Sequence, residues 1–172
     1  MRIFIPAMGP KDMRMFEVQC LAKKSRDEEI LVTGKVDESI VDSVQVAVSI
    51  LSYDTLKLSQ RFYNRKYHFH FADGSFAKEG TSAGLGIALA LLQAVGCLPG
   101  LSRFNQVLAT GEIDLFGEVH SVGGIEMKAS LLEQHGLDCV IMPDQPLLAR
   151  LAQDRVIRVS NLKELIVEAT QG

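Results

Sequence analysis

The 172-residue sequence predicts an α/β protein, of the α+β kind, with a mixed sheet. In the second half, short apolar strands alternate with helical segments, which is typical of parallel βαβ arrangements. In the first half, strand patterns follow one another as in a hairpin. The composition is 47% hydrophobic, enough for a proper core, and the chain has no repeat, low-complexity tract or domain-scale linker. Residues 1–172 are therefore expected to form one domain.

The first half contains four strand patterns and one amphipathic helix. Strands are expected over residues 2–6, 13–20, 30–36 and 67–71, the second and third forming an antiparallel hairpin around a charged turn at 22–29. Asp37-Glu38-Ser39 is a helix start signal, and the helix is expected over residues 39–58. Apolar residues recur on it at helical spacing and predict its buried face: Ile40, Val44, Ala47, Ile50 and Leu51.

The second half is divided by glycines and prolines. A helix is expected at 85–95, a loop at 96–105, a strand at 106–115 with a turn and return at 116–122, and a helix at 125–134 ended by His135-Gly136. A buried strand at 139–142, a short helix at 147–152, a strand at 156–159 and a helix at 162–169 capped near Ser160-Asn161 complete the chain.

Composition excludes several classes of protein. The net charge is −3 without a basic stripe, so neither nucleic acid nor a membrane is an expected partner. Cys20, Cys97 and Cys139 are widely spaced and odd in number, which indicates a reducing cytosol rather than disulfides or zinc. The N-terminus lacks a signal-peptide layout, and the apolar run 85–95 is too short to cross a bilayer. A cytoplasmic protein is expected.

Two histidines share one face of the strand at 67–71. His68 and His70 alternate there with Phe69 and Phe71, which lie on the other face. A His-x-His pair suits a metal, but no third ligand is evident, so no metal site is predicted.

A serine lies where a polar loop at 72–75 and the segment Gly80-Thr81-Ser82-Ala83-Gly84 lead into the apolar helix. A helix N-terminus offers unpaired N–H groups and a partial positive charge, which together hold an oxyanion. Ser82 is therefore a candidate nucleophile. Serine is also a favoured helix cap, and on this segment alone capping is the favoured role.

A lysine is the candidate base. None of the four histidines lies in a sequence pattern that indicates a catalytic base, and Ser–Lys pairs are a known variant of the catalytic triad. Lys128 lies in the first turn of the helix after Gly123-Gly124, where the helix dipole favours a neutral amine. Met127, Leu131 and Leu132 make the helix apolar, and burial would lower the pKa further. From spacing alone, an ordinary surface lysine is the favoured interpretation.

Taken together, several ordered segments resemble the C-terminal proteolytic domain of the Lon protease family. Residues 77–84, A-K-E-G-T-S-A-G, match the family's P-K-D-G-P-S-A-G around its serine. The other matches are T-G-E-I at residues 110–113, G-x-V-x-x-x-G-G-x-K-E-K at 117–128, H-V-H-V at 68–71 and L-T-G…S-x-Q-A-A-L-S at 31–49. The resemblance runs from about residue 16 to 142 and onward, which makes it specific.

This resemblance implies a fold related to the second domain of ribosomal protein S5, and a serine endopeptidase with a Ser82–Lys128 dyad. It implies that Thr110 positions the lysine amine and that Glu79 pairs with Lys128 in a resting state. The backbone around Gly80, Thr81, Ala83 and Gly84 would form the oxyanion site and serine turn, and Gly123 and Gly124 the turn before the lysine. The sequence departs from the family at Thr81, Glu79 and Glu126-Met127, none of which is a dyad member.

The resemblance also implies partners. Family members degrade unfolded or regulatory proteins and form homo-hexamers with an AAA+ ATPase module, which binds ATP and magnesium. The sequence has no Walker A loop, so no cofactor is expected on this chain, and the ATPase would act in cis or in trans.

Two alternatives remain open at the level of sequence. One is a non-proteolytic Lon-like oligomerisation or scaffold module of an ATPase-linked protein, which usually lacks the dyad. The other is a small-molecule kinase of the GHMP type, which has a Gly/Ser-rich helix entry that binds phosphate. Ala83-Gly84-Leu85-Gly86 resembles that entry only faintly, and the chain is short for such a kinase.

Overall fold

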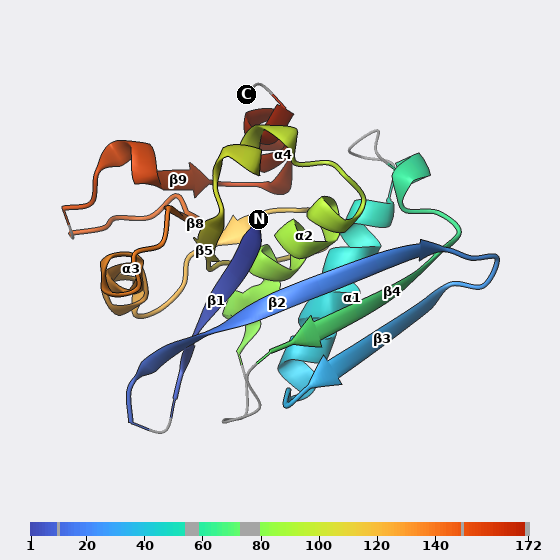
Figure 1. The fold of residues 1–172 in the computed structure, drawn as a ribbon, viewed down its shortest axis with the longest axis horizontal. Helices are drawn as coiled ribbons and strands as arrows, with labels where there is room; N and C mark the ends of the chain where they lie inside the picture. Colours follow the sequence, from blue (N-terminus) through green and yellow to red (C-terminus); the bar gives the residue numbers. More distant parts are fainter. Residues whose placement is uncertain (10, 54–58, 73–79, 149, 171–172) are drawn as a thin grey trace.

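A computed structural model describes residues 1–9, 11–53, 59–72, 80–148 and 150–170. Figure 1 shows the main sheet, whose seven strands have the order β3-β4-β2-β1-β5-β8-β9. β6 and β7 form a separate two-stranded hairpin. The strands are β1 (Arg2–Met8), β2 (Met13–Lys24), β3 (Glu29–Gly34), β4 (Arg65–Phe71), β5 (Gln106–Ala109), β6 (Glu112–Ile113), β7 (Val119–His120), β8 (Cys139–Pro143) and β9 (Val156–Val159). The helices are α1 (Glu38–Ser52), α2 (Gly84–Ala94), α3 (Ile125–Gln134) and α4 (Leu162–Thr170).

The sheet is mixed, as the sequence predicts. β2 pairs antiparallel with β1 and β4, whereas the pairs β3–β4, β1–β5, β5–β8 and β8–β9 are parallel. The expected hairpin between β2 and β3 is wrong, because β4 lies between them. α1 connects β3 to β4, and a helix crossover is the connection that parallel neighbours require. β2 also continues to Lys24, so part of the expected turn at 22–29 is strand.

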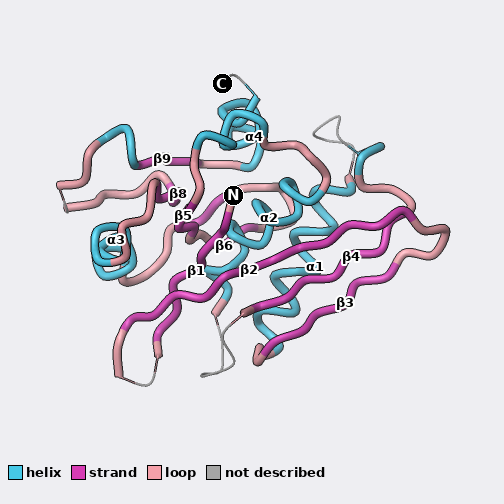
Figure 2. The backbone as a smooth tube through the Cα atoms, viewed as in Figure 1, coloured by secondary structure: helices cyan, strands magenta, loops and turns pink. Residues whose placement is uncertain are grey.

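Side chains alternate between two layers of core. On one face, Ile5, Ala109 and Ile141 pack with α1 and α2. On the other face, Phe4, Leu108 and Val140 pack with α3. The tube view in Figure 2 follows α1 and α2 behind the long strands, with α3 beside the short ones. Opposite faces of the strands β1, β5 and β8 therefore carry different helices.

Most helix ends lie where the local start and stop signals in the sequence predict them. Asp37 caps α1, its carboxylate accepting the N–H of Ile40 at 3.2 Å, and the five residues of the expected buried face are all buried. α1 ends at Ser52, whereas the prediction extended to 58, and residues 54–58 lie outside the described part. α3 has its predicted bounds. α4 is capped by Asn161, whose Oδ1 accepts the N–H of Glu164, and the Glu164 carboxylate accepts the N–H of Ser160.

Three segments differ from the prediction. The strand expected over 106–115 is broken into β5 and β6 at Thr110 and Gly111, where the N–H of Gly111 donates to the carbonyl of Ser82 rather than to a neighbouring strand. The loop at 96–105 contains a 3-10 helix, Pro99–Arg103. The described residues of 147–152 form no helix, and a 3-10 helix follows at Gln153–Arg155.

No helix in the described ranges is long and apolar enough to span a membrane. The three cysteines are free thiols, and burial raises the pKa of Cys20 and of Cys139 to about 12. Thiols held protonated in this way behave as small apolar side chains rather than as nucleophiles.

Candidate active site

Ser82 lies in a single 3-10 turn, Thr81–Ala83, that leads directly into α2. The cap positions of the turn and of α2 are Gly80 and Ala83, and neither has a capping side-chain hydrogen bond. Ser82 is therefore at the cap position of neither helix, although capping was the favoured role from this segment alone. Its side chain is half-buried, Thr81 is exposed and Ala83 is buried.

The end of β5 holds the serine turn in place. The carbonyl oxygen of Ser82 accepts the N–H of Gly111 at 2.9 Å, and the N–H of Leu85 donates to the carbonyl of Gly111 at 2.9 Å. Thr110 is fully buried and its Oγ1 lies 3.5 Å from the carbonyl oxygen of Ser82. Gly84 permits this close approach, because a Cβ atom there would lie 2.9 Å from Ile113 Cγ1. Residues 110 and 111 thus fix the backbone on the C-terminal side of Ser82.

Lys128 is buried, with 8% of its surface exposed. It occupies the first turn of α3, where its N–H donates to the carbonyl of Gly124 at 3.0 Å. Gly124 has φ = 65°, a left-handed conformation that favours glycine, while a Cβ on Gly123 would meet nothing within 4 Å. Leu131 and Leu132 are buried as expected, but Met127 is 50% exposed.

Burial lowers the pKa of Lys128 from its ordinary value of 10.5, since desolvation disfavours the charged amine. Within the described ranges the structure gives the amine no hydrogen bond or ion pair that would offset this effect. Glu79, its expected carboxylate partner, lies outside the described residues. A buried amine with a lowered pKa is suited to accept a proton.

Ser82 and Lys128 belong to elements on opposite faces of the same strands. α2 packs on the face of Ala109 and Ile141, and α3 on the face of Leu108 and Val140. Thr110 directly follows β5, and its N–H donates to the carbonyl of Ile141 on β8 at 3.1 Å. β5, with Thr110 directly after its end, therefore lies between the helix that follows Ser82 and the helix that carries Lys128.

One contact of the serine turn was not expected from the sequence. The N–H of Gly80, predicted as part of the oxyanion site, donates to Ser39 Oγ at 2.8 Å. In the sequence, Ser39 is part of the start signal of α1, and nothing in its local pattern indicates a contact with a residue 41 positions away. Gly111 likewise belongs to the T-G-E-I segment, which does not indicate a contact with Ser82.

The histidine pair lies apart from this site, on the face of β4 opposite α1. Phe69 and Phe71 are buried, whereas His68 Nε2 and His70 Nδ1 each lie within 2.9 Å of Thr33 Oγ1 on β3. Among the described residues, no group of three or more His, Cys, Asp or Glu is placed to hold a metal.

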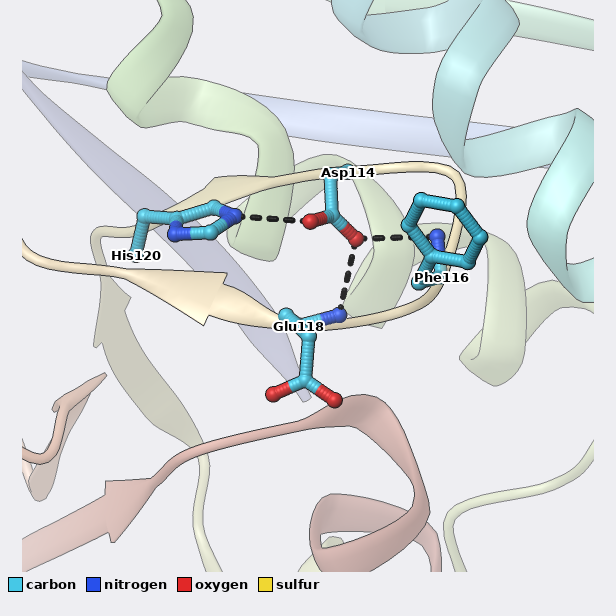
Figure 3. Close-up of polar contacts among 4 residues, drawn as sticks. All are labelled: Asp114, Phe116, Glu118 and His120. Carbon is cyan, nitrogen blue, oxygen red and sulfur yellow. Dashed lines mark hydrogen bonds and ion pairs between the residues drawn. The ribbon is translucent and has the colours of Figure 1, made fainter.

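The hairpin after Gly111 has its own polar centre (Figure 3). Asp114 Oδ1 accepts the N–H groups of Phe116 and Glu118, and Asp114 Oδ2 lies 2.8 Å from His120 Nε2. Desolvation acts to raise the pKa of Asp114, but the hydrogen bonds from His120 and from the two N–H groups outweigh it and lower the pKa. Phe116 at the tip is 85% exposed.

The fold defines a mixed α/β domain with a serine at the entry of an apolar helix. A family model described as the Lon protease (S16) C-terminal proteolytic domain matches residues 8–168. The chain belongs to this family, and its mixed sheet is consistent with that domain.

Individual relatives of the chain are Lon proteases as well. The Lon protease of Erwinia amylovora is 31% identical over 137 residues, 78% of this chain and 17% of that protein. That of Shigella dysenteriae is 30% identical over 155 residues, 84% of this chain and 18% of the relative. That of Neorickettsia sennetsu is 32% identical over 135 residues, 77% and 16% respectively. The match thus spans less than a fifth of each of these relatives.

Proposed function

We propose that this chain is a serine endopeptidase in which Ser82 is the nucleophile and Lys128 the general base. Membership of the Lon protease family supports peptide-bond hydrolysis. The observation that carries the assignment of the base is the burial of Lys128, which lowers its pKa. A lysine can take a proton only when it is neutral, and an amine in water near neutral pH is not.

In the proposed reaction, Lys128 Nζ takes the proton of Ser82 Oγ as Oγ attacks the substrate carbonyl carbon. N–H groups of the serine turn stabilise the oxyanion. The Gly80 N–H is directed to Ser39, so Thr81, Ser82 and Ala83 are the donors we propose. Lys128 then protonates the leaving amine, and an acyl ester remains on Ser82. Water attacks this ester, Lys128 takes the proton of the water, and Ser82 regains its hydrogen.

Thr110 is proposed to position the lysine amine, since it is buried directly after β5, the strand that lies between α2 and α3. Glu79 is proposed to pair with Lys128 in a resting state, because a neighbouring carboxylate raises a lysine pKa and keeps the amine charged. Gly123 and Gly124 would set the entry of α3.

We further propose unfolded or regulatory proteins as substrates, in the cytoplasm, with an AAA+ ATPase module in cis or in trans and a homo-hexameric assembly. ATP and magnesium would bind that module rather than this chain. These proposals rest on the resemblance to the Lon protease family, and the relatives above are each named as a Lon protease.

Cleavage of casein and of an unstructured fluorogenic peptide by the unmodified chain, Ser82→Ala, Lys128→Ala and Lys128→Arg tests the dyad. All three variants are expected to lose at least about 10³-fold in kcat, because the members of such a unit depend on one another. Equal cleavage by Lys128→Ala would refute the base. A fluorophosphonate is expected to label Ser82, whereas a scaffold module would not react.

A further inference from the structure

A side chain of α1 holds the backbone just before the nucleophile. Ser39 Oγ accepts the N–H of Gly80 at 2.8 Å and donates its own proton to Asp37 Oδ1 at 2.7 Å. Asp37 is itself the cap of α1, fixed by the N–H of Ile40. The three groups form a directed chain of hydrogen bonds from a helix cap to the serine turn.

The donor and acceptor roles in this chain are unambiguous. A serine hydroxyl has one proton, and a carboxylate only accepts, so the Ser39 proton points to Asp37 and a lone pair is left for Gly80. Donation to a charged acceptor makes a short, strong hydrogen bond. The hydroxyl is therefore held in one orientation by the carboxylate that caps α1.

Gly80 needs such a contact. It has φ = 104° and ψ = 137°, a conformation that other residues rarely adopt and that glycine leaves easily because it has no Cβ. Two residues later comes Ser82. On the far side of Ser82, Gly111 already holds the carbonyl oxygen. Ser39 supplies the matching contact on the near side, so the serine turn is held at both ends.

We infer that Ser39, through Gly80, is a positioning residue that sets the orientation of the Ser82 turn. The expected effect on kcat rests on the proposed function. The hydrogen bond between Ser39 and Gly80 rests on the structure alone. Ser39→Ala removes the acceptor of Gly80, so Ser82 is expected to spend less time aligned for attack. Misalignment lowers the rate of the chemical step without weakening substrate binding.

The kinetic test compares the unmodified chain with Ser39→Ala, Ser39→Thr and Ser49→Ala. Ser49 lies on the exposed side of the same helix and controls for loss of a serine hydroxyl. We expect Ser39→Ala to lower kcat roughly 3- to 10-fold with KM unchanged. Labelling of Ser82 by the fluorophosphonate should slow in proportion. Because Lys128 is untouched, the inflection of the pH profile should stay in place. Ser39→Thr, which keeps the hydroxyl, should restore the rate, and Ser49→Ala should match the unmodified chain.

A second measurement does not depend on catalysis. Hydrogen exchange of the Gly80 amide is measured by NMR in Ser82→Ala and in Ser82→Ala with Ser39→Ala. Loss of the acceptor is expected to speed exchange at Gly80 at least about fivefold, while amides in α2 keep their protection. If all amides speed up together, Ser39 acts on general stability and the inference is wrong.

The two failures are distinguishable. Absence of cleavage and of Ser82 labelling in the unmodified chain would contradict the proposed function. Cleavage by Ser39→Ala at the unmodified rate, or unchanged exchange at Gly80, would contradict the role of Ser39 and leave the dyad intact.

Discussion

The N–H of Gly111 donates to the carbonyl oxygen of Ser82 at 2.9 Å. This hydrogen bond fixes the backbone of the proposed nucleophile next to the end of β5. The contact is possible because two glycines let the segments approach. A Cβ on Gly111 would lie 2.9 Å from Val119 Cγ1, and one on Gly84 would lie 2.9 Å from Ile113 Cγ1 and 3.1 Å from its backbone nitrogen.

Gly84→Ala should therefore destabilise the protein. Overpacking against backbone costs up to about 3 kcal/mol, whereas the gain in helix propensity is at most about 1 kcal/mol. We expect a net loss of about 1–2 kcal/mol, at about 2–4 °C in Tm per kcal/mol for a chain of this size. Gly123→Ala, where a Cβ meets nothing, is the control in calorimetry. Equal Tm values for the two variants would contradict the close approach.

Thr110→Val should show what the hydroxyl of Thr110 contributes to activity and stability, because the variant keeps the volume of the side chain. The two side chains have nearly the same shape, so the variant loses only the polar contacts of a fully buried hydroxyl. We expect kcat to fall about tenfold and the free energy of unfolding to fall by about 1 kcal/mol. Thr33→Val, which removes a hydroxyl that bonds to the histidine pair of β4, is the matched control and should keep its kcat. A Thr110→Val enzyme with full activity would exclude a positioning role.

Lys128→Met should raise stability while abolishing activity. The folded pKa of Lys128 is lowered, so below it the folded state must bury a charge, and stability increases as pH rises through the folded pKa toward 10.5. An apolar side chain of similar length removes this cost and should add about 1 kcal/mol near neutral pH. The gain in Tm should shrink as pH rises. A Tm below that of the unmodified chain at neutral pH would mean that a partner of the amine stabilises the fold.

The pH profile of cleavage reports the same amine. The neutral fraction of Lys128 increases as pH rises through its folded pKa, so kcat/KM should rise with pH and level off at an inflection below 10.5. Initial rates with the fluorogenic peptide between about pH 6 and pH 10 measure this curve. A profile that falls across this range would point to a different base.

Asp114→Ala should weaken the hairpin in a pH-dependent way. The folded pKa of Asp114 is lowered from its ordinary value of 3.8, so its contribution to stability is present above that value and is lost as pH falls through the folded pKa. The difference in Tm between the two proteins should therefore be present at neutral pH and vanish in strong acid. Glu118→Ala, which keeps the backbone N–H that Asp114 binds (Figure 3), serves as the control. A difference in Tm that is independent of pH would exclude the charge of Asp114 as the cause.

Local features were predictable from local sequence. The bounds of α3 follow from Gly123-Gly124 and His135-Gly136, and the start of α1 follows from Asp37, because caps and left-handed glycines act over a few residues. The buried faces of α1 and β4 follow from periodicity. The family could be predicted because several motifs occur in the family's order along the chain, although no single motif is sufficient.

Two of the errors concern contacts between distant segments. β4 lies between β2 and β3, since strand pairing depends on residues far away along the chain. The strand expected over 106–115 breaks because the Gly111 N–H bonds to Ser82 rather than to a neighbouring strand. Segment 147–152 has helical composition, yet the residues described there form no helix.

The sequence by itself determined the mixed α/β class, the family, and the two side chains proposed for catalysis. Only the tertiary structure decided that Lys128 is buried and that Ser39 and Gly111 hold the serine turn from either side. Burial and long-range hydrogen bonds arise when segments pack together, and packing is a property of the whole fold that no local pattern contains.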